Sequence, residues 1–548
     1  MRSTLNSLLR LLLFILVLGA TARAQDVLPN CPPRPLPGQP VETPPSLTSQ
    51  NGVLRVALTL KTQIGLMNYS DYCLDYSGPP GLGFVESPTL RLNPGDQLIM
   101  DLTNGLPLPS GAHASPISGP ANASENGMGH DGMGPAMAGG CSGHMSSVAT
   151  NMHFHGLNVP PTCHQDDVIN TLLQPGDPTF EYRITIPGND APGLYWYHPH
   201  PHGATTKQVN GGAAGAIIIG GMEKLRPEVA GLPERLLILR QQFPNSPTWV
   251  PGPFEFTLNY QPSILPPPRI NMKPNTKEFW RFVNASTQAF LKLQVTYGTD
   301  QQTLEVIALD GIPLSKPLFV KSIPLAPASR AEFIVQAPSS GMTGTFETLA
   351  VNTGAVGNPN AYQQLAVIET SKTGGDNLPR IPQLVSAGNG AVGPSRFANL
   401  AQQTPTTTRK LYFSEATSGT NGPTKYYITL QGRTPHVFTM GEPPAITTTV
   451  GTVEDWTIEN HAQENHAFHI HQIHFLVMDV NGVPVKEPYL ADTMTVPYWN
   501  GAGTYPSIMV RMDFRDPDIA GTFVYHCHVL QHEDSGMMAK IQVNPAVR

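Results

Sequence analysis

Histidines gather in four short clusters of this 548-residue sequence, and imidazole nitrogens are common ligands of transition metals. A single His-x-His pair is a weak signal, because such a pair also suits the polar face of a strand. Four pairs in one chain are hard to reach by chance, so together they indicate metal binding. Ten of the 18 histidines lie in the clusters, which are His153-Phe154-His155, His198-Pro199-His200, the group His466, His469 and His471, and His526-Cys527-His528 with His532.

The His-x-His spacing indicates that strands carry these ligands. Residues i and i+2 of a strand point to the same face, so each pair presents two imidazoles to one centre. Four pairs supply eight nitrogens, which is more than the four ligands of a tetrahedral zinc site. We therefore predict a cluster of several metal ions.

Cys527 lies between His526 and His528, far along the chain from the other four cysteines. Alternation along a strand turns its thiolate to the face opposite the two flanking imidazoles. The thiolate is then covalently continuous with ligands of the cluster. This arrangement predicts a second, separate metal site that is joined to the cluster through one tripeptide.

Three more residues can complete the site around Cys527. His466 lies three residues before His469, so an extended segment turns its ring away from the cluster. His532 follows the cysteine by five residues and Met537 follows it by ten. Two histidines, one thiolate and a weak thioether are the ligand set of a blue-copper electron-transfer site.

With these motifs the chain resembles the three-domain multicopper oxidases, the family of laccases, ascorbate oxidase and bacterial copper-efflux oxidases. The resemblance covers essentially the whole mature chain. It implies an all-β fold of three cupredoxin-like Greek-key β-barrels and four copper ions. It further implies a type 1 copper held by His466, Cys527, His532 and axial Met537, a type 2 copper held by His153 and His469, and a type 3 pair held by His155, His198, His200, His471, His526 and His528.

The chain departs from the family pattern at two positions beside the ligands. The family usually has proline after the first histidine of the third motif and glycine after the last, where this chain has Ala467 and Gln472. Neither residue is a ligand, so the departures concern the geometry of the site. Met537 occupies a position that is Leu or Phe in high-potential laccases, and we predict a low-to-middling type 1 potential.

The resemblance implies that a donor gives single electrons to the type 1 copper and that dioxygen is reduced to water at the cluster. The protons need a carboxylate within reach, directly or through water. Glu533, adjacent to ligand His532, matches an acid that this family uses. Asp166 or Asp167, downstream of the first motif, is the second candidate. The alternative interpretation of each of these three acids is a solvated surface carboxylate without a catalytic role.

The elements that position these residues are predicted to be strands. Apolar and polar residues alternate over 54–60 and 180–186, which is typical of half-buried strands. The segments LIMDLTN, EFWRFVN and EDWTIEN end at Asn104, Asn284 and Asn460, 180 and 176 residues apart. This recurrence suggests three copies of one β-unit.

We expect three domains, at 25–225, 226–400 and 401–548, with the type 1 copper in the third. No histidine occurs between His202 and His436, so the middle domain is predicted to be a metal-free spacer. Residues 109–149, rich in Gly, Ala, Ser and Met, are predicted to form a long loop inserted before the first histidine motif. Thioethers suit cuprous copper, but a flexible linker is the interpretation we favour.

Residues 1–24 have the features of an export signal, with arginines around an apolar run and a small-residue cleavage site. We expect a secreted or periplasmic protein without a membrane anchor after cleavage. An oxidising compartment permits two disulfides among Cys31, Cys73, Cys141 and Cys163, and the sequence leaves their pairing open. The formal net charge of −7 without a basic block argues against nucleic acid as a partner.

Our main hypothesis is a monomeric, laccase-like oxidase whose partners are dioxygen and a phenolic or related one-electron donor. The nearest alternative is a metal oxidase acting on Cu(I) in copper tolerance, which only the inserted loop favours. A copper nitrite reductase fits less well, because it does not need eight cluster imidazoles. A non-catalytic copper-binding cupredoxin protein is expected to lose ligands, whereas every ligand position is filled here.

Overall fold

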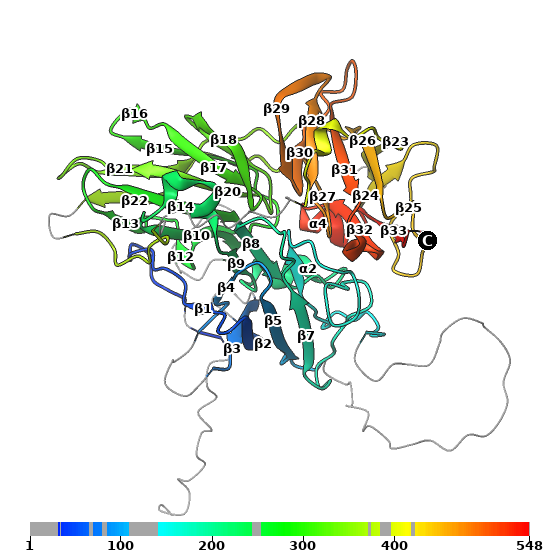
Figure 1. Cartoon of the computed structure of the whole chain (residues 1–548), viewed down its shortest axis with the longest axis horizontal. Helices are drawn as coiled ribbons and strands as arrows, with labels where there is room; N and C mark the ends of the chain where they lie inside the picture. Colours follow the sequence, from blue (N-terminus) through cyan, green and yellow to red (C-terminus); the bar gives the residue numbers. More distant parts are fainter. Residues whose placement is uncertain are drawn as a thin grey trace, which may run out of the picture.

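The computed structural model describes residues 31–32, 34–64, 70–78, 85–108, 141–243, 254–370, 374–383, 396–417 and 422–546. The predicted export signal and residues 109–140 of the predicted insertion lie outside this part. The described chain is nearly all β and forms six sheets (Figure 1). The expected all-β class is therefore confirmed. Among the described residues, no helix combines the length and hydrophobicity needed to cross a bilayer.

The first two sheets pack around a core of leucine, isoleucine and aromatic side chains. One has the order β3 (Ser70–Tyr76), β2 (Val53–Ile64), β5 (Gln97–Asn104) and β7 (Phe180–Thr185). The other has the order β1 (Ser46–Thr48), β4 (Thr89–Leu92), β9 (Gly215–Ile219), β8 (Gly193–His198) and β6 (His153–His155). The short helix α2 (Thr205–Asn210) connects β8 to β9. The alternating segments predicted at 54–60 and 180–186 are β2 and β7.

The second pair of sheets follows α3 (Met222–Leu225) and η2 (Pro227–Val229). One has the order β12 (Gln261–Pro262), β11 (Glu255–Leu258), β10 (Glu234–Gln242), β14 (Lys277–Asn284), β20 (Arg330–Gln336), β17 (Leu304–Leu309) and β18 (Ile312–Val320). The other has the order β13 (Arg269–Met272), β22 (Gln363–Thr370), β21 (Gly344–Thr348), β15 (Leu291–Tyr297) and β16 (Asp300–Gln301), with β19 (Ile323–Leu325) also paired to β15. They enclose a second core.

The third pair follows η3 (Leu400–Gln402) and encloses a third core that includes Cys527 and Met537. One sheet has the order β24 (Thr424–Leu430), β23 (Thr407–Thr417), β26 (Thr452–Asn460), β31 (Ser507–Phe514), β28 (Phe475–Val480) and β29 (Val483–Ala491). The other has the order β25 (Ile446–Thr449), β33 (Met538–Asn544), β32 (Gly521–Cys527), β27 (His466–Ile470) and β30 (Thr493–Val496). Two short helices complete it, η4 (Pro517–Ile519) and α4 (Leu530–Asp534).

The three sheet pairs repeat one pattern. The central strands β5, β14 and β26 each run parallel to one neighbour, respectively β2, β10 and β23. On the other side each runs antiparallel to β7, β20 or β31. We call the three sheet pairs the first, middle and third repeat. We propose that the domain boundaries predicted near residues 225 and 400 apply, because β9 ends at Ile219 before β10 begins at Glu234, and β22 ends at Thr370 before β23 begins at Thr407.

An asparagine ends each central strand in the same way, which explains the recurring Asn of the three similar segments. Each side-chain amide is buried and donates hydrogen bonds of 2.8 to 3.2 Å to two backbone carbonyls, which belong to Val148 and Leu173 for Asn104, Ala289 and Ala326 for Asn284, and Glu464 and Val496 for Asn460. Buried backbone carbonyls need such partners. In the third repeat this bond fixes the loop that leads to His466.

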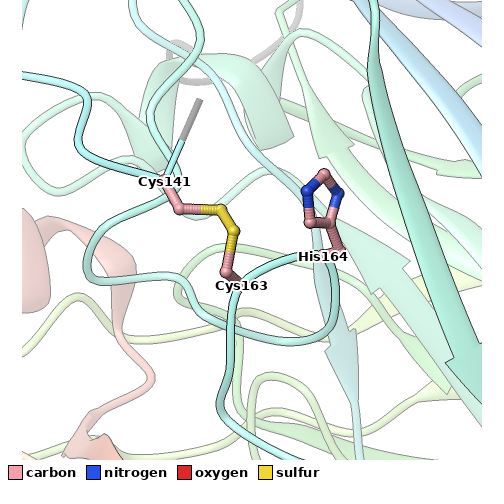
Figure 2. A group of neighbouring side chains, drawn as sticks. All are labelled: Cys141, Cys163 and His164. Carbon is pink, nitrogen blue, oxygen red and sulfur yellow. A yellow bond between two sulfur atoms is a disulfide. The ribbon is translucent and has the colours of Figure 1, made fainter. Parts of the chain in front are cut away.

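The four N-terminal cysteines form two disulfides, Cys31–Cys73 and Cys141–Cys163. Figure 2 shows the second disulfide with the ring of His164 beside it. Because both sulfurs are used in the bond, this group has no thiolate to offer a metal ion. Cys527 is buried and forms no disulfide within the described chain, as its isolation in the sequence led us to expect.

Candidate metal centre

Two pairs of neighbouring strands bring the four His-x-His motifs together. His153 on β6 pairs with His198 on β8 in the first repeat, and His469 on β27 pairs with His526 on β32 in the third. The two repeats face each other here, and α2 and α4 lie side by side next to the contact (Figure 1). All eight motif histidines are buried. Strand geometry thus directs eight imidazoles into one space between the outer repeats.

The eight imidazoles form three groups, the first two of which share His155. In each group the ligand atoms lie within 4.8 Å of one another: His153 with His155 and His469, His155 with His198 and His528, and His200 with His471 and His526. The Nε2 atom of His526 lies 3.3 Å from that of His200 and 3.2 Å from that of His471. Two ligands at about 2.0–2.1 Å from one ion and at a near-tetrahedral angle lie roughly 3.3 Å apart. The rings are therefore arranged as ligands would be.

Unpaired ring nitrogens support the same interpretation. Buried polar atoms are normally hydrogen-bonded. Among the described residues, however, one buried nitrogen of His153, His155, His198, His469 and His471, and both of His528, have no hydrogen-bond partner. Burial and the neighbouring imidazoles lower the pKa of His153 well below its usual range. A neutral imidazole keeps a lone pair for a metal ion, so the donor set fits copper.

A second group lies around Cys527. The Sγ atom of Cys527 lies 3.5 Å from Nδ1 of His466 and 3.8 Å from Nδ1 of His532, and the two nitrogens lie 3.3 Å apart. Burial raises the pKa of the thiol to about 12, so a thiolate here needs the charge of a bound cation. Met537 is fully buried, and its backbone carbonyl accepts a hydrogen bond from the Cys527 amide. This donor set fits a blue-copper site.

The outward edge of this group is covered by two residues that the sequence did not indicate. Tyr426 stacks on the His532 ring, with centroids 4.1 Å apart. The carboxyl of Glu464 lies 3.3 Å from Nε2 of His532. Burial and the nearby Glu415 raise the pKa of Glu464 to about 9. His532, which is 5% exposed, is therefore bordered by an aromatic ring and a carboxyl group.

The predicted acids lie at different distances from the cluster. Both oxygens of Asp166 lie 3.0 Å from Nδ1 of His153, and one accepts a 2.5 Å hydrogen bond from Gln472. Burial raises the pKa of Asp166 well above its usual range. Asp167 instead accepts hydrogen bonds from the backbone and side chain of Asn170. Of the two aspartates, Asp166 is the one beside a motif histidine.

Glu533 is buried at the edge of the cluster. Its carboxyl oxygens lie 3.0 Å from Nδ1 of His526 and 3.5 Å from Nε2 of His200. Burial raises its pKa to about 7. Adjacent residues of a helix point about 100° apart, so α4 directs His532 to the Cys527 group and Glu533 to the cluster. A surface acid is therefore the wrong interpretation of Glu533.

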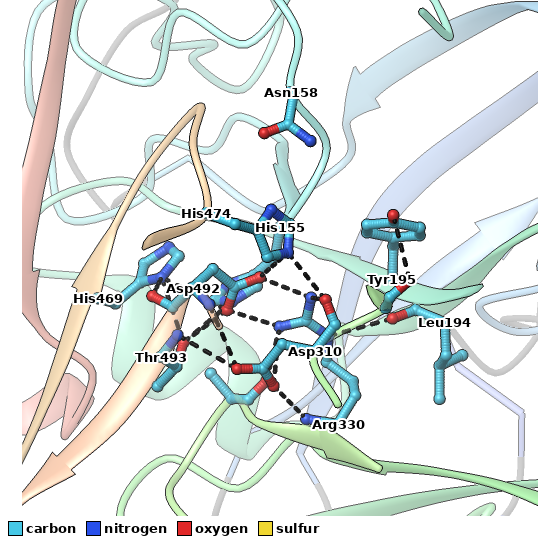
Figure 3. Close-up of polar contacts among 12 residues, drawn as sticks. His155, Asn158, Leu194, Tyr195, Asp310, Arg330, His469, His474, Asp492 and Thr493 are labelled. Atoms are coloured by element: carbon cyan, nitrogen blue, oxygen red, sulfur yellow. Dashed lines mark hydrogen bonds and ion pairs between the residues drawn. The ribbon is translucent and has the colours of Figure 1, made fainter. Parts of the chain in front are cut away.

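The middle repeat, which is predicted to be a metal-free spacer, also contacts residues of the cluster. Arg330 and Asp310 of this repeat form a buried network with Asp492, His155 and His474 (Figure 3). His474 thus lies beside the ligand groups and contacts Asp492 and Asp310. No sequence pattern pointed to Arg330 or Asp492, because neither belongs to a motif.

The comparisons with known proteins agree with this site. Residues 144–224, 196–373 and 406–547 match three family models, each described as multicopper oxidase. The chain belongs to the multicopper oxidase family. It is therefore an oxidoreductase, and copper is its cofactor.

Individual relatives are distant but cover most of the chain. A multicopper oxidase of Staphylococcus epidermidis is 24% identical over 505 residues, which are 88% of each chain. A laccase of Bacillus stratosphericus is 22% identical over 84% of this chain and 89% of its own length. Among solved structures, a Campylobacter jejuni multicopper oxidase described as a metallo-oxidase has a TM-score of 0.63 at 22% identity, covering 95% of this chain and 98% of that one. McoA from Aquifex aeolicus has a TM-score of 0.64 at 19% identity, covering 93% and 100%.

Proposed function

We propose that this protein couples four one-electron oxidations of a donor to the four-electron reduction of dioxygen to two waters. The observation that carries the proposal is the position of one tripeptide. The Cys527 sulfur belongs to the group with His466 and His532, while His526 and His528 belong to two of the three imidazole groups. Electrons accepted at the first group thus have a covalent route to the second.

We also propose which residues bind each copper ion. A type 1 copper would be held by His466, Cys527 and His532, with Met537 as a weaker fourth ligand. A type 2 copper takes His153 and His469. A type 3 pair takes the six remaining motif histidines, as His155, His198 and His528 for one ion and His200, His471 and His526 for the other. The proposal is supported by the three imidazole groups and by the unpaired ring nitrogens.

Copper, when bound, supplies the one-electron chemistry and the binding of dioxygen. The chain supplies the surroundings. The buried motif histidines and their neighbours exclude bulk water from the cluster. Glu533 beside His526 and Asp166 beside His153 are the proposed sources of protons, which they hold on buried carboxyl groups.

We propose a phenolic or related aromatic compound as the donor. Tyr426, stacked on His532, offers an aromatic surface at the proposed electron-accepting edge. A relative described as a laccase supports the same class. A second candidate, Cu(I), is favoured by the methionines of segment 109–149 and by a structural relative described as a metallo-oxidase.

Oxygen uptake decides between the two donors. Copper-loaded protein is given a phenol, Cu(I) or Fe(II) at matched concentrations, and the same series is run on a variant that lacks residues 109–140. We expect the phenol to support the highest kcat/KM and the deletion to leave every rate unchanged. Faster oxidation of Cu(I) that the deletion removes would establish the metal oxidase instead. Hydrogen peroxide as the product would contradict reduction to water.

The axial position gives a further prediction. Replacing Met537 by leucine removes the thioether and keeps the volume of the side chain, so the protein should stay folded and blue. The type 1 potential should rise, because the axial ligand tunes this potential and an absent ligand favours the cuprous state. Redox titration of the blue absorbance measures it. An unchanged potential would mean that Met537 is not a ligand, and a wild-type value as high as that of the Leu or Phe laccases would refute the predicted low-to-middling potential.

We also propose that the protein acts outside the cytoplasm, in a periplasm or in the medium. The two disulfides support this proposal, because such bonds persist in oxidising compartments. N-terminal sequencing of protein recovered outside the cytoplasm tests it, and a mature chain that begins near residue 25 is expected.

A further inference from the structure

Asp492 contacts two motif histidines at once, through different groups. Its Oδ1 atom lies 3.1 Å from Nε2 of His155, and its backbone carbonyl accepts a 2.8 Å hydrogen bond from Nδ1 of His469. His155 comes from the first repeat and His469 from the third, and their rings are stacked 4.0 Å apart. One residue therefore fixes the orientation of two proposed ligands from different repeats (Figure 3).

Arg330 reaches Asp492 from β20 of the middle repeat. Its Nη1 and Nη2 atoms donate hydrogen bonds of 2.7 and 2.6 Å to the two carboxylate oxygens, and neither residue has any exposed surface. The remaining N–H groups of Arg330 are also used, since Nε donates to the carbonyl of Leu194, Nη1 to that of Ala328 and Nη2 to that of Asp310. A planar guanidinium bound in this way sets the plane of the carboxylate, which a lysine ammonium cannot do.

The chemistry of this contact determines which nitrogen of His155 is free. Asp492 is paired through both carboxylate oxygens with the Arg330 guanidinium, and its Oδ1 atom accepts the Nε2 proton of His155. Nδ1 then carries the lone pair, and Nδ1 is the buried atom of this ring that lacks a partner in the described chain. Such carboxylate–histidine contacts orient metal ligands and raise their basicity.

Gly156 allows the ion pair to approach the ligand strand. A Cβ atom at this position would lie 2.4 Å from Nη2 of Arg330 and 2.8 Å from Oδ2 of Asp492. The backbone of Gly156 is also left-handed, with φ +87°. A side chain at this position would clash with the ion pair, so the residue directly after His155 has to be glycine.

We propose that Arg330, although it lies in the repeat without His-x-His motifs, is a positioning residue for the copper cluster. It holds Asp492 in the one orientation that directs Nδ1 of His155 and Nε2 of His469 into the cluster. The inference rests on the proposed ligand assignment. Its consequence is that the middle repeat controls the metal affinity of a cluster whose ligands all come from the two outer repeats.

A purely structural ion pair between repeats is the competing explanation, and the middle repeat offers a matched control. Arg235 is equally buried and binds the carboxylate of Glu278 through Nε and Nη2, at 2.8 and 3.1 Å. Neither residue belongs to the imidazole groups. Arg330→Lys and Arg235→Lys keep the charge and remove the planar fork, so both test the loss of a buried pair, and only the first tests the cluster.

The experiment measures metal content in the full chain. Wild type, Arg330→Lys, Arg235→Lys and Asp492→Asn are loaded with copper and dialysed against a graded series of chelator concentrations. Copper per chain, blue absorbance and the paramagnetic resonance signal of the type 2 copper are then recorded. We expect Arg330→Lys and Asp492→Asn to lose cluster copper at about 10–100-fold lower chelator concentration than wild type, with the blue absorbance retained. Arg235→Lys should retain wild-type copper content.

The other outcomes overturn the inference. Copper retention and a type 2 signal equal to those of wild type in Arg330→Lys or in Asp492→Asn would show that the pair does not position the ligands. Equal copper loss in Arg330→Lys and Arg235→Lys would assign both pairs to general stability. If circular dichroism shows that Arg330→Lys does not fold, the copper content of Asp492→Asn alone decides the question. Asparagine has nearly the same shape as aspartate, so this variant is expected to fold. A failure of the proposed function would look different, because the wild-type protein itself would then lack the cluster copper and the type 2 signal.

Discussion

Replacing Cys527 by serine should remove the blue absorbance and abolish oxygen consumption with every donor. Serine keeps nearly the shape of cysteine but replaces a soft sulfur with a hard oxygen, which is a poor ligand for a blue-copper site. The copper content should fall from four ions per chain to three. Steady-state oxygen uptake, absorbance and metal analysis of the same sample measure the three effects.

The neighbouring residue provides the opposite variant. His528 belongs to an imidazole group, so His528→Gln should spare the group around Cys527 and disturb the cluster. This variant should stay blue and should lose its colour when a donor is added. The colour should not return in air, because electrons can enter the protein but cannot reach dioxygen. A Cys527→Ser protein that still consumes oxygen, or a colourless His528→Gln protein, would show that the tripeptide does not separate the two centres.

Replacing Glu533 by glutamine should slow the reduction of dioxygen by about 100-fold or more, which is the range for losing a proton-transferring group. Glutamine keeps the size of the side chain and cannot release a proton to the cluster. The carboxyl group of Glu533 is fully buried between His526 and His200, so bulk water does not easily replace it. The blue absorbance and the copper content should be unchanged.

The two half-reactions of the Glu533 variant provide the internal control. Loss of the blue colour on mixing with a donor under nitrogen should proceed at the wild-type rate, because this step uses the group around Cys527. Recovery of the colour on mixing with oxygen should be slow. Loss of copper would instead assign Glu533 a structural role, and recovery at the wild-type rate would mean that protons reach the cluster by another route.

The parts of the molecule that local sequence patterns determine could be predicted well. The i, i+2 spacing of the histidines places two imidazoles on one strand face, and the same rule turns Cys527 to the opposite face. The recurring asparagine identified three copies of one β-unit, because the hydrogen bonds that it makes are the same in each copy. Each of these inferences needs only a few neighbouring residues.

The parts that depend on contacts between repeats could not be predicted. Arg330 and Asp492 are 162 residues apart, and an isolated Arg or Asp carries no pattern that links it to a partner. Glu464 contacts His532 from a different loop, and the pairing of the four N-terminal cysteines depends on how the loops pack. The sequence shows that Gln472 replaces the usual glycine of the family, but it does not show which contact the glutamine makes. Gln472 adopts a left-handed φ of 59° and binds Asp166 across the contact between the outer repeats.

The most direct test of the account is a copper count combined with an absorption spectrum of purified protein reconstituted with copper. We expect four copper ions per chain and an intense blue colour, since one sulfur-ligated ion and three imidazole-bound ions are required together. A colourless protein, or one that holds far fewer than four ions, would contradict the account.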